Sequence, residues 1–485
     1  DPAMTRILAA ILASTALSLG GCTMDEGGTA PLASASSGAG AAAPADAPQA
    51  RNVILFIGDG MGVSTVTATR IYAGQKLGQS GEEYVLPFEA FENVALVKTY
   101  NTNAQVPDSA GTATAMHSGA KTNIGVLGIA AAGGHGDCAA ALANPLPLLG
   151  EEAKERGLAL GIVSTARLTH ATPASVYARS ANRDWEADAW VPEDQRGLGC
   201  KDIATQLVES DWDVALGGGS VVMYGSEHGG RRMEAGADLP AAWTARTGGT
   251  YVTTQAELEA ARVDAPVLGV FSPSHMTYMV DRKPDSTEPT LTDMTAQALG
   301  RLGQDPDGYY LMVESGRIDH GHHAGQAGYA LEEAVEFARA IQYAIDNTDP
   351  EETLIMVTAD HSHVFTIAGY PRRGNDILGL VVPPTGGDED HSGEDATEGT
   401  PSLAADGKPY TTLGYGNGPG AVSGERPIPE MGVHAHQQSV VPTESETHGG
   451  EDVALFAQGP GAGGAHGVIE QNVIYDIIRK AYGWE

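Results

Sequence analysis

Short apolar runs alternate with helical patterns along most of the chain, and this alternation constrains the fold more than any other feature. Each run is bounded by Gly or Asp, which is typical of a buried strand. The predicted strands are 53–57, 158–163, 214–216, 267–271, 309–313, 354–357 and 453–456, and the predicted helices are 147–156, 292–302, 326–346 and 468–482. Alternating strands and helices favour an α/β fold with a large, mostly parallel central sheet and helices on both faces.

Potential metal ligands follow several of these predicted strands. Asp59 follows the first strand, residues 164–172 follow the second, Glu314 follows the fifth, and Asp360 and His361 follow the sixth. Ligands bind beyond the carboxyl ends of the strands in sheets of this kind. The sequence therefore predicts a metal site at that edge of the sheet.

The densest group of metal-ligand residues lies between Glu314 and His323. Asp319 and His323 are four residues apart, so on a helix they share one face and can bind one ion. Carboxylate oxygen combined with imidazole nitrogen suits zinc. Such a stretch by itself fits a polar turn equally well, but the motif 360–363 and His448 give two further groups of the same chemistry.

Ser109 is the candidate nucleophile, because it precedes a segment of small residues that is predicted to be helical. A helix N-terminus offers free N–H groups to an anion. A nearby metal ion would activate the serine hydroxyl by lowering its pKa. Without such an ion, the common role of a serine at this position is a helix N-cap.

The charge balance limits the possible partners. The 485 residues are 42% hydrophobic and 19% charged, as expected of a folded chain, and the net charge is −34. Binding to a nucleic-acid backbone is therefore not expected. Small anionic substrates remain possible, because bound metal ions reverse the potential locally.

The N-terminal region is predicted to be an export signal and a tether. With Met4 taken as the start, Arg6 and the apolar segment 7–19 resemble a signal peptide over residues 4–21. The segment 19–22 ends in Cys22 and resembles a lipobox, which predicts lipid attachment to Cys22; the alternative is an ordinary cleaved signal. Residues 22–50 are rich in Ala, Gly, Ser and Pro and predict a flexible tether.

Export would place the mature protein in the periplasm or cell envelope, anchored by lipid rather than by a spanning helix. Cys138 and Cys200 would then lie in an oxidising compartment, where a disulfide between them is plausible; two buried free thiols are the alternative. Residues 374–407 contain no Lys or Arg and many acidic residues, which predicts an inserted surface loop. A solvated charge run is favoured there over a calcium site.

Seven segments together resemble the alkaline phosphatase family. They are 58–62, 108–115, 169–173, 182–185, 314–323, 358–364 and 447–452. The resemblance extends from about residue 51 to residue 482, which implies one catalytic domain over 51–485 with an insertion at about 374–440. His170 and His320 stand where the enteric bacterial type has Asp and Lys, so the chain is more similar to the animal-type members.

The resemblance implies two zinc ions and one magnesium ion per subunit. Asp319, His323 and His448 would bind the first zinc, and Asp360, His361 and Asp59 the second, on which Ser109 would also act as a ligand. Asp59 would bridge to the magnesium, which Glu314 and Thr172 would bind directly and His170 through water. His363 would contact a ligand rather than an ion, and His320 and His322 would do the same or be solvated.

The implied reaction is hydrolysis of phosphate monoesters at alkaline pH through a phosphoserine on Ser109. Arg183 would bind two phosphate oxygens and Asp108 would orient Arg183. The implied ions and ligands leave a positive pocket on an acidic protein, and few contacts to the alcohol portion imply broad specificity.

One departure from the family pattern and two alternatives remain. The animal enzymes have a calcium site near residues matching Phe271 and Asp285, but Ser272 stands where a carboxylate is expected, so that site is predicted to be absent or altered. A homodimer is implied by the family alone. A phosphodiesterase, phosphonate hydrolase or sulfatase on the same metal core is one alternative, and a non-catalytic metal-binding lipoprotein is another.

Overall fold

The structure is a computed structural model that describes residues 49–385 and 399–484. The predicted signal peptide, Cys22, nearly all of the tether and the acidic run at 388–398 lie outside the described residues. Within the described part, no helix is both long enough and apolar enough to cross a membrane.

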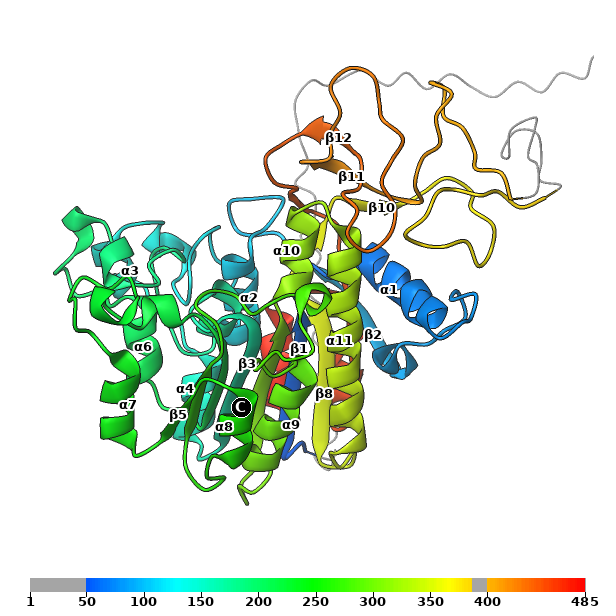
Figure 1. Ribbon diagram of the computed structural model, residues 1–485. Coiled ribbons are helices and arrows are strands. Elements are labelled where there is room, and N and C mark those ends of the chain that lie inside the picture. Colours follow the sequence, from blue (N-terminus) through cyan, green and yellow to red (C-terminus); the bar gives the residue numbers. More distant parts are fainter. Residues whose placement is uncertain (1–48, 386–398, 485) are drawn as a thin grey trace, which may run out of the picture. The chain divides into compact units, whose positions relative to one another are not determined.

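A ten-stranded sheet forms the centre of the described fold (Figure 1). Its strand order is β15-β2-β14-β8-β1-β7-β3-β4-β6-β5. The strands are β1 (Asn52–Gly58), β2 (Asn93–Lys98), β3 (Ala159–Arg167), β4 (Val214–Gly218), β5 (Thr250–Val252), β6 (Val267–Val270), β7 (Tyr309–Ser315), β8 (Thr353–Ala359), β14 (Val453–Gln458) and β15 (Gly467–Glu470). Only β14 runs antiparallel to its neighbours, so the prediction of a mostly parallel sheet is confirmed.

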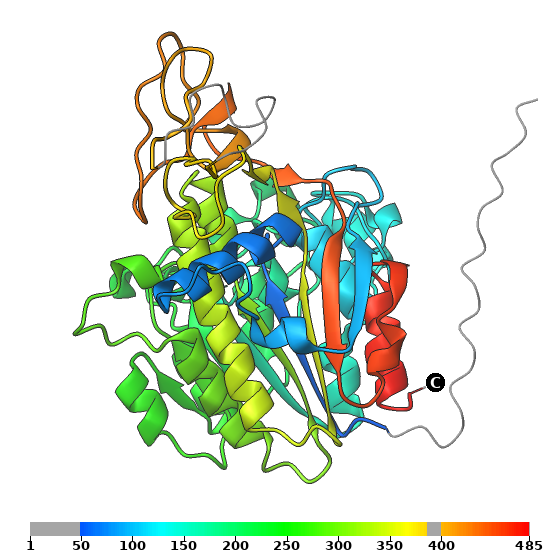
Figure 2. The same cartoon turned by 90° about the vertical axis from the view of Figure 1, so that its right-hand side faces the viewer.

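Helices cover both faces of this sheet, and Figure 2 shows α11 and α13 on opposite sides of it. The α-helices are α1 (Val63–Lys76), α2 (Ser109–Ser118), α3 (Cys138–Ala143), α4 (Leu149–Glu155), α5 (Ala171–Ala174), α6 (Ile203–Glu209), α7 (Leu239–Thr247), α8 (Gln255–Ala260), α9 (Leu291–Leu302), α10 (Arg317–His323), α11 (Ala327–Asp346) and α13 (Val473–Ala481). Phe56 of β1 packs edge-on against Phe337 of α11, with ring centres 5.9 Å apart. Tyr310 of β7 meets His117 of α2 in the same way at 6.0 Å. The neighbouring strands β1 and β7 thus bury aromatic rings under helices on the two faces of the sheet.

The predicted helix over 468–482 is wrong at its start. Residues Gly467–Glu470 form β15, in which Val468 pairs with Leu96 of β2, and the helix begins only at Val473. Strand β2 was itself not predicted. Its residues 94–97 are all apolar, but only Ala95 and Val97 are buried, as expected near the edge of a sheet.

A long insertion leaves the sheet after β8 and returns before β14. It contains the small sheet β10 (Phe365–Ile367), β11 (Leu413–Gly418) and β12 (Ser439–Pro442), which Figure 1 shows above α10. Phe365, Leu413 and Tyr415 bury their side chains in a core of this part. The short strands β9 (Ser362–His363) and β13 (His448–Gly449) pair antiparallel at its base, with His363 opposite His448.

Candidate active site

The carboxyl ends of three adjacent strands bring the predicted acidic residues together. Gly58 of β1 is in register with Ser315 of β7 and with Ala359 of β8. Asp59 and Asp360 therefore leave neighbouring strands at the same level, and Glu314 lies beside them. The side chains of all three are completely buried. The chain has left strand β8 at Asp360, which allows Asp360 and His361 to face one site.

These buried carboxylates fit a cation. Both oxygens of Asp59, Oε1 of Glu314, Oδ2 of Asp360 and Oγ1 of Thr172 are buried without a hydrogen-bond partner among the described residues. Burial, followed by the neighbouring carboxylates, raises the pKa of Asp59, and burial raises the pKa of Glu314 to about 7. Unpaired buried oxygens are costly, and divalent cations are partners that suit oxygen donors. The donor set thus fits the implied metal ions.

A group of imidazoles adjoins the carboxylates. Nε2 of His361 lies 3.4 Å from Oδ1 of Asp59 and 3.3 Å from Oδ2 of Asp360. Oδ1 of Asp319 lies 3.3 Å from Nε2 of His323 and 3.4 Å from Nε2 of His448. The structure therefore brings together the two trios of residues predicted from the sequence.

Glu446 orients the trio of Asp319, His323 and His448. It was not predicted as a site residue. Its carboxylate lies 2.5 Å from Nδ1 of His363, whose Nε2 lies 2.8 Å from Oδ1 of Asp319. Burial alone would lower the pKa of His363, but these two carboxylates outweigh it and raise the pKa to about 10. His363 therefore contacts a predicted ligand. The side chain of His322 is buried between Thr65 and Tyr415, so it is not solvated.

Helix α2 presents Ser109 to this site. Asp108 is its N-cap and accepts the N–H of Gly111 at 3.1 Å, and the helix ends at Gly119 in the left-handed conformation. Ser109 is 2% exposed, and its hydroxyl lies 3.1 Å from Nε2 of His361. The close approach of neighbouring segments requires Gly60, because a Cβ there would meet Nε2 of His363 at 2.3 Å.

Arg183 reaches the same region from a loop. Its Nη1 donates to Oδ2 of Asp108 at 3.1 Å, and its Nη2 donates to Nε2 of His170 at 3.1 Å. Asn101 and Gly125 also donate to the Asp108 carboxylate, so that Asp108 is fixed from several sides. Burial would raise the pKa of Asp108, but Arg183 and the backbone N–H groups lower it.

His170 connects this arrangement to two other histidines. A nitrogen of His170 and oxygens of Asp59 and Glu314 lie within 4.8 Å of one another, as a third ion would require. On its other side His170 packs against His275, with ring centres 5.2 Å apart, and against His320 at 5.6 Å. His275 was missed because a Ser-Pro-Ser segment separates it from its strand, and the sequence gives no ligand pattern around it.

Two further expectations concern regions away from these clusters. A disulfide joins Cys138 to Cys200, with Cα atoms 5.8 Å apart. At the position of the expected calcium site, the Ser272 hydroxyl donates to the carbonyl of Ser274 at 2.8 Å, and Asp285 is exposed.

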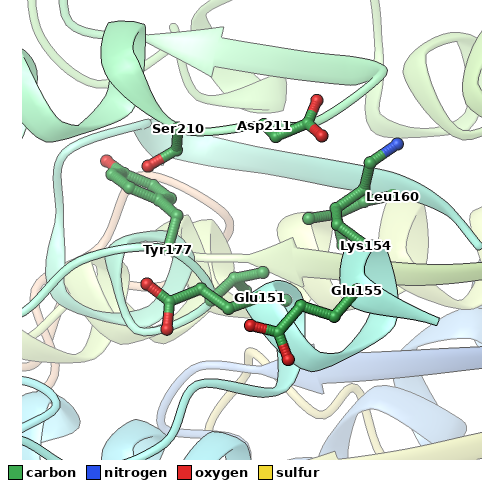
Figure 3. A pocket seen from close by; sticks show the side chains of 9 residues that line it. Glu151, Lys154, Glu155, Leu160, Tyr177, Ser210 and Asp211 are labelled. Carbon is green, nitrogen blue, oxygen red and sulfur yellow. The ribbon is translucent and has the colours of Figure 1, made fainter. Parts of the chain in front are cut away.

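A surface pocket of about 490 Å³ lies elsewhere on the fold (Figure 3). Glu151, Glu155 and Lys154 of α4 line it from one side, and Tyr177, Ser210 and Asp211 line it from the other. No predicted site residue belongs to its lining. The pocket therefore contains none of the predicted metal-ligand residues that lie at the strand ends.

The fold and the site define an α/β protein with clustered metal-ligand residues at the carboxyl edge of its sheet. The sequence profile of the family described as alkaline phosphatase matches residues 50–483. The chain belongs to the alkaline phosphatase family, so the resemblance seen in the sequence is confirmed.

Known proteins agree with this assignment. The tissue-nonspecific isozyme of alkaline phosphatase from Gallus gallus is 48% identical over 458 residues, covering 89% of this chain and 84% of that protein. The same isozyme from Homo sapiens is 45% identical over 459 residues, covering 89% and 83%. These relatives agree with the similarity to animal-type members.

Solved structures confirm the fold. The alkaline phosphatase from the Antarctic bacterium TAB5 matches with a TM-score of 0.62 and 24% identity, over 90% of this chain and 99% of that one. The Thermus thermophilus alkaline phosphatase matches with a TM-score of 0.64 and 25% identity, over 90% and 92%.

Proposed function

We propose that this protein hydrolyses phosphate monoesters to an alcohol and inorganic phosphate, with broad specificity and an alkaline pH optimum, through a phosphoserine on Ser109. The observation that carries the proposal is the position of the Ser109 hydroxyl. It lies at a helix N-terminus, 3.1 Å from His361, on the helix whose N-cap residue Asp108 holds Arg183. Membership of the alkaline phosphatase family supports the same reaction.

Different residues of the chain would bind the phosphate and form the bond to phosphorus. Arg183, with its planar fork, would bind two phosphate oxygens while Asp108 holds the guanidinium in place. The oxygen of Ser109 would form a bond to phosphorus as the bond to the alcohol oxygen breaks and the alcohol leaves with a proton. Water would then cleave the bond between phosphorus and Ser109 and restore the hydroxyl.

Two zinc ions and one magnesium ion are proposed as the cofactors. Asp319, His323 and His448 would hold one zinc, and Asp59, Asp360 and His361 the other, with Ser109 adjoining. Glu314, Thr172 and Asp59 supply the oxygen donors that suit magnesium, and His170 lies beside them. Bound divalent ions supply acidity toward hydroxyl groups and stabilise charge on the leaving oxygen.

Two measurements test the reaction. The wild-type protein with zinc and magnesium should hydrolyse a simple aryl phosphate at alkaline pH, and excess chelator should abolish this activity. Ser109→Ala should bind phosphate but form no labelled phosphoenzyme after rapid acid quenching. Labelling of the Ala variant at the wild-type yield would exclude Ser109 as the nucleophile.

A phosphodiesterase on the same core is the second candidate. Arg183 favours monoesters, because a second organic group would compete for the space around the phosphate oxygens that the guanidinium binds. Rates for phenyl phosphate and for bis(phenyl) phosphate separate the two candidates. Faster cleavage of the diester would overturn the monoesterase assignment.

A homodimer and export are proposed as well. At the β15 edge of the sheet, Val94, Leu96 and Val468 are 47%, 43% and 56% exposed, and an apolar sheet face of this kind suits a second copy of the chain. The disulfide Cys138–Cys200 suits an oxidising compartment, in line with a periplasmic lipoprotein anchored through Cys22. Sedimentation of Leu96→Glu would test the dimer, and mass analysis of the exported chain would test lipid on Cys22.

A further inference from the structure

Asn101 contacts the carboxylate that holds Arg183. Its Nδ2 donates to Oδ1 of Asp108 at 3.0 Å, and Oδ2 of the same carboxylate accepts from Nη1 of Arg183 at 3.1 Å. Within residues 49–385 and 399–484, Asp108 is the only residue with which Arg183 forms an ion pair. The orientation of this one carboxylate therefore controls the direction of the guanidinium.

Four donors fix the carboxylate of Asp108, two on each oxygen. Oδ1 accepts from Asn101 and from the N–H of Gly111 at 3.1 Å, and Oδ2 accepts from Arg183 and from the N–H of Gly125 at 3.0 Å. Two of the four donors are backbone groups, whose positions the fold sets. Asn101 is the one neutral side chain of this set, so a substitution can remove its hydrogen bond without changing the guanidinium.

An amide suits this position chemically. An ionised carboxylate only accepts hydrogen bonds, so the NH2 group of Asn101, and not its carbonyl, must face Asp108. The amide is also uncharged, so it leaves the negative charge of Asp108 to Arg183. A lysine at this position would compete with Arg183 for that charge.

The fold holds Asn101 rigidly. Its N–H donates to the carbonyl of Ala104 at 3.1 Å, and its own carbonyl accepts the N–H of Ala104 at 3.2 Å, so a tight turn fixes its backbone. Its side chain lies against helix α2, where a Cβ on Gly111 would meet Oδ1 of Asn101 at 2.5 Å. Asn101 is only 4% exposed, so water has little access to replace its hydrogen bond.

We propose that Asn101 is a positioning residue for phosphate binding. Its amide fixes the plane of the Asp108 carboxylate, and this carboxylate directs the guanidinium of Arg183 toward two phosphate oxygens. In this role Asn101 touches neither the substrate nor a metal ion. The proposal rests on the proposed monoesterase function, in which Arg183 binds the phosphate.

Phosphate binding without turnover tests this role. In the Ser109→Ala background with zinc and magnesium bound, calorimetric titration with inorganic phosphate gives a Kd that no reaction step affects. Asn101→Asp keeps the shape of the side chain but replaces the NH2 group that faces Asp108 with an acceptor oxygen. We expect the Kd to rise about tenfold, because the lost hydrogen bond to a charged group is joined by repulsion between two carboxylates.

Asn103→Asp is the matched control on the same loop. It adds the same charge two residues away from Asn101. Oδ1 of Asn103 accepts the N–H of Ile124 at 2.9 Å, and a carboxylate can keep this acceptor role. The Kd of this variant should stay within about twofold of the parent value, which measures the general effect of a negative charge near an anion site.

A double-mutant cycle separates positioning from a merely structural role. If Asn101 acts through Asp108, Asn101→Asp should change the Kd little in the Asp108→Ala background, so the two effects are not additive. Additive effects would show that Asn101 only stabilises the loop and would overturn the proposal. If Asn101→Asp does not fold, Asn101→Ala takes its place, with an expected rise in Kd of about threefold that again disappears in the Asp108→Ala background.

The remaining outcomes are distinguishable. If the wild-type protein hydrolyses no aryl phosphate, the proposed function fails. If the wild-type protein is active, an unchanged Kd in Asn101→Asp overturns only the positioning role. Loss of bound zinc in Asn101→Asp would also overturn it, because the loop would then act through His448, whose Nδ1 donates to the carbonyl of Pro107 at 2.7 Å.

Discussion

The carboxylate of Glu446 lies 2.5 Å from Nδ1 of His363, and both side chains are fully buried. The backbone carbonyl of Glu446 also accepts a hydrogen bond from Nδ1 of His323, again at 2.5 Å. Glu446 thus fixes the orientation of two rings that contact Asp319. Partners of this kind direct the ligand atoms of a metal site toward the ion.

Replacing Glu446 should weaken metal binding. Glu446→Gln keeps the backbone carbonyl near His323 but exchanges the carboxylate that holds His363, so the orientation of Asp319 suffers. We expect zinc affinity to fall about 10- to 100-fold, measured by competition with a chelator of known affinity. Glu444→Gln, two residues away and exposed, is the matched control. Equal zinc affinity in both variants would contradict the role of Glu446.

Metal removal should destabilise the protein, and a neutral substitution should reverse part of the loss. Without ions, the buried carboxylates of Asp59, Asp360 and Glu314 repel one another, which is the reason that the pKa of Asp59 rises further than burial alone would raise it. In excess chelator, Asp59→Asn should therefore be more stable than the wild type, by about 1–3 kcal/mol. With zinc and magnesium present, the order should reverse, since the variant loses a ligand. Thermal unfolding in both conditions measures the two differences.

The stability of the protein should fall below neutral pH in part because of His117. This ring is completely buried against Tyr310 and Ser175, and burial lowers its pKa from 6.5 to about 4. The unfolded chain therefore binds a proton at a higher pH than the folded one, so stability is complete above pH 6.5 and is lost as the pH falls toward 4. The loss attributable to His117 is about 3 kcal/mol.

A variant isolates this contribution. His117→Gln removes the titrating group but retains polar atoms for Tyr310. Between pH 7 and pH 4, the free energy of unfolding of the wild type should decrease by about 3 kcal/mol more than that of the variant. Urea denaturation across this range provides the measurement. Parallel pH profiles for the two proteins would show that the pKa of His117 is the same in the folded and unfolded states.

Removal of the disulfide should weaken the part of the chain that carries Arg183. Cys138 and Cys200 are 62 residues apart, and the loop that they close contains His170, Thr172 and Arg183. The double variant Cys138→Ala, Cys200→Ala should lose up to about 4 kcal/mol of stability, because the unfolded chain gains freedom. Urea unfolding of the variant and of the oxidised wild type measures the loss. An unchanged midpoint would mean that the bond adds no net stability.

The acidic residues at the strand ends could be predicted from the sequence because each one directly follows a pattern that is visible in a few neighbouring residues. Asp59, Glu314 and Asp360 each follow a continuous apolar run, and a parallel sheet brings such positions to one edge. The side chains that hold the site together lack such a signal. Glu446 acts through a contact with a residue 83 positions away, and His275 meets His170 only after the chain has folded. The apolar run 94–97 of strand β2 carries the same local signal, and it was overlooked.

The pairing of His363 with His448 closes the insertion at its base. The chain leaves the catalytic centre at one of these residues and returns at the other, so the ligand spacing does not depend on how many residues lie between them. With the residues around Glu446 kept, the rest of the insertion could therefore be lengthened, shortened or exchanged for another folded unit while the proposed metal ligands stay in place. In engineering terms, this is an acceptor position at which a binding module could be grafted directly beside a catalytic centre.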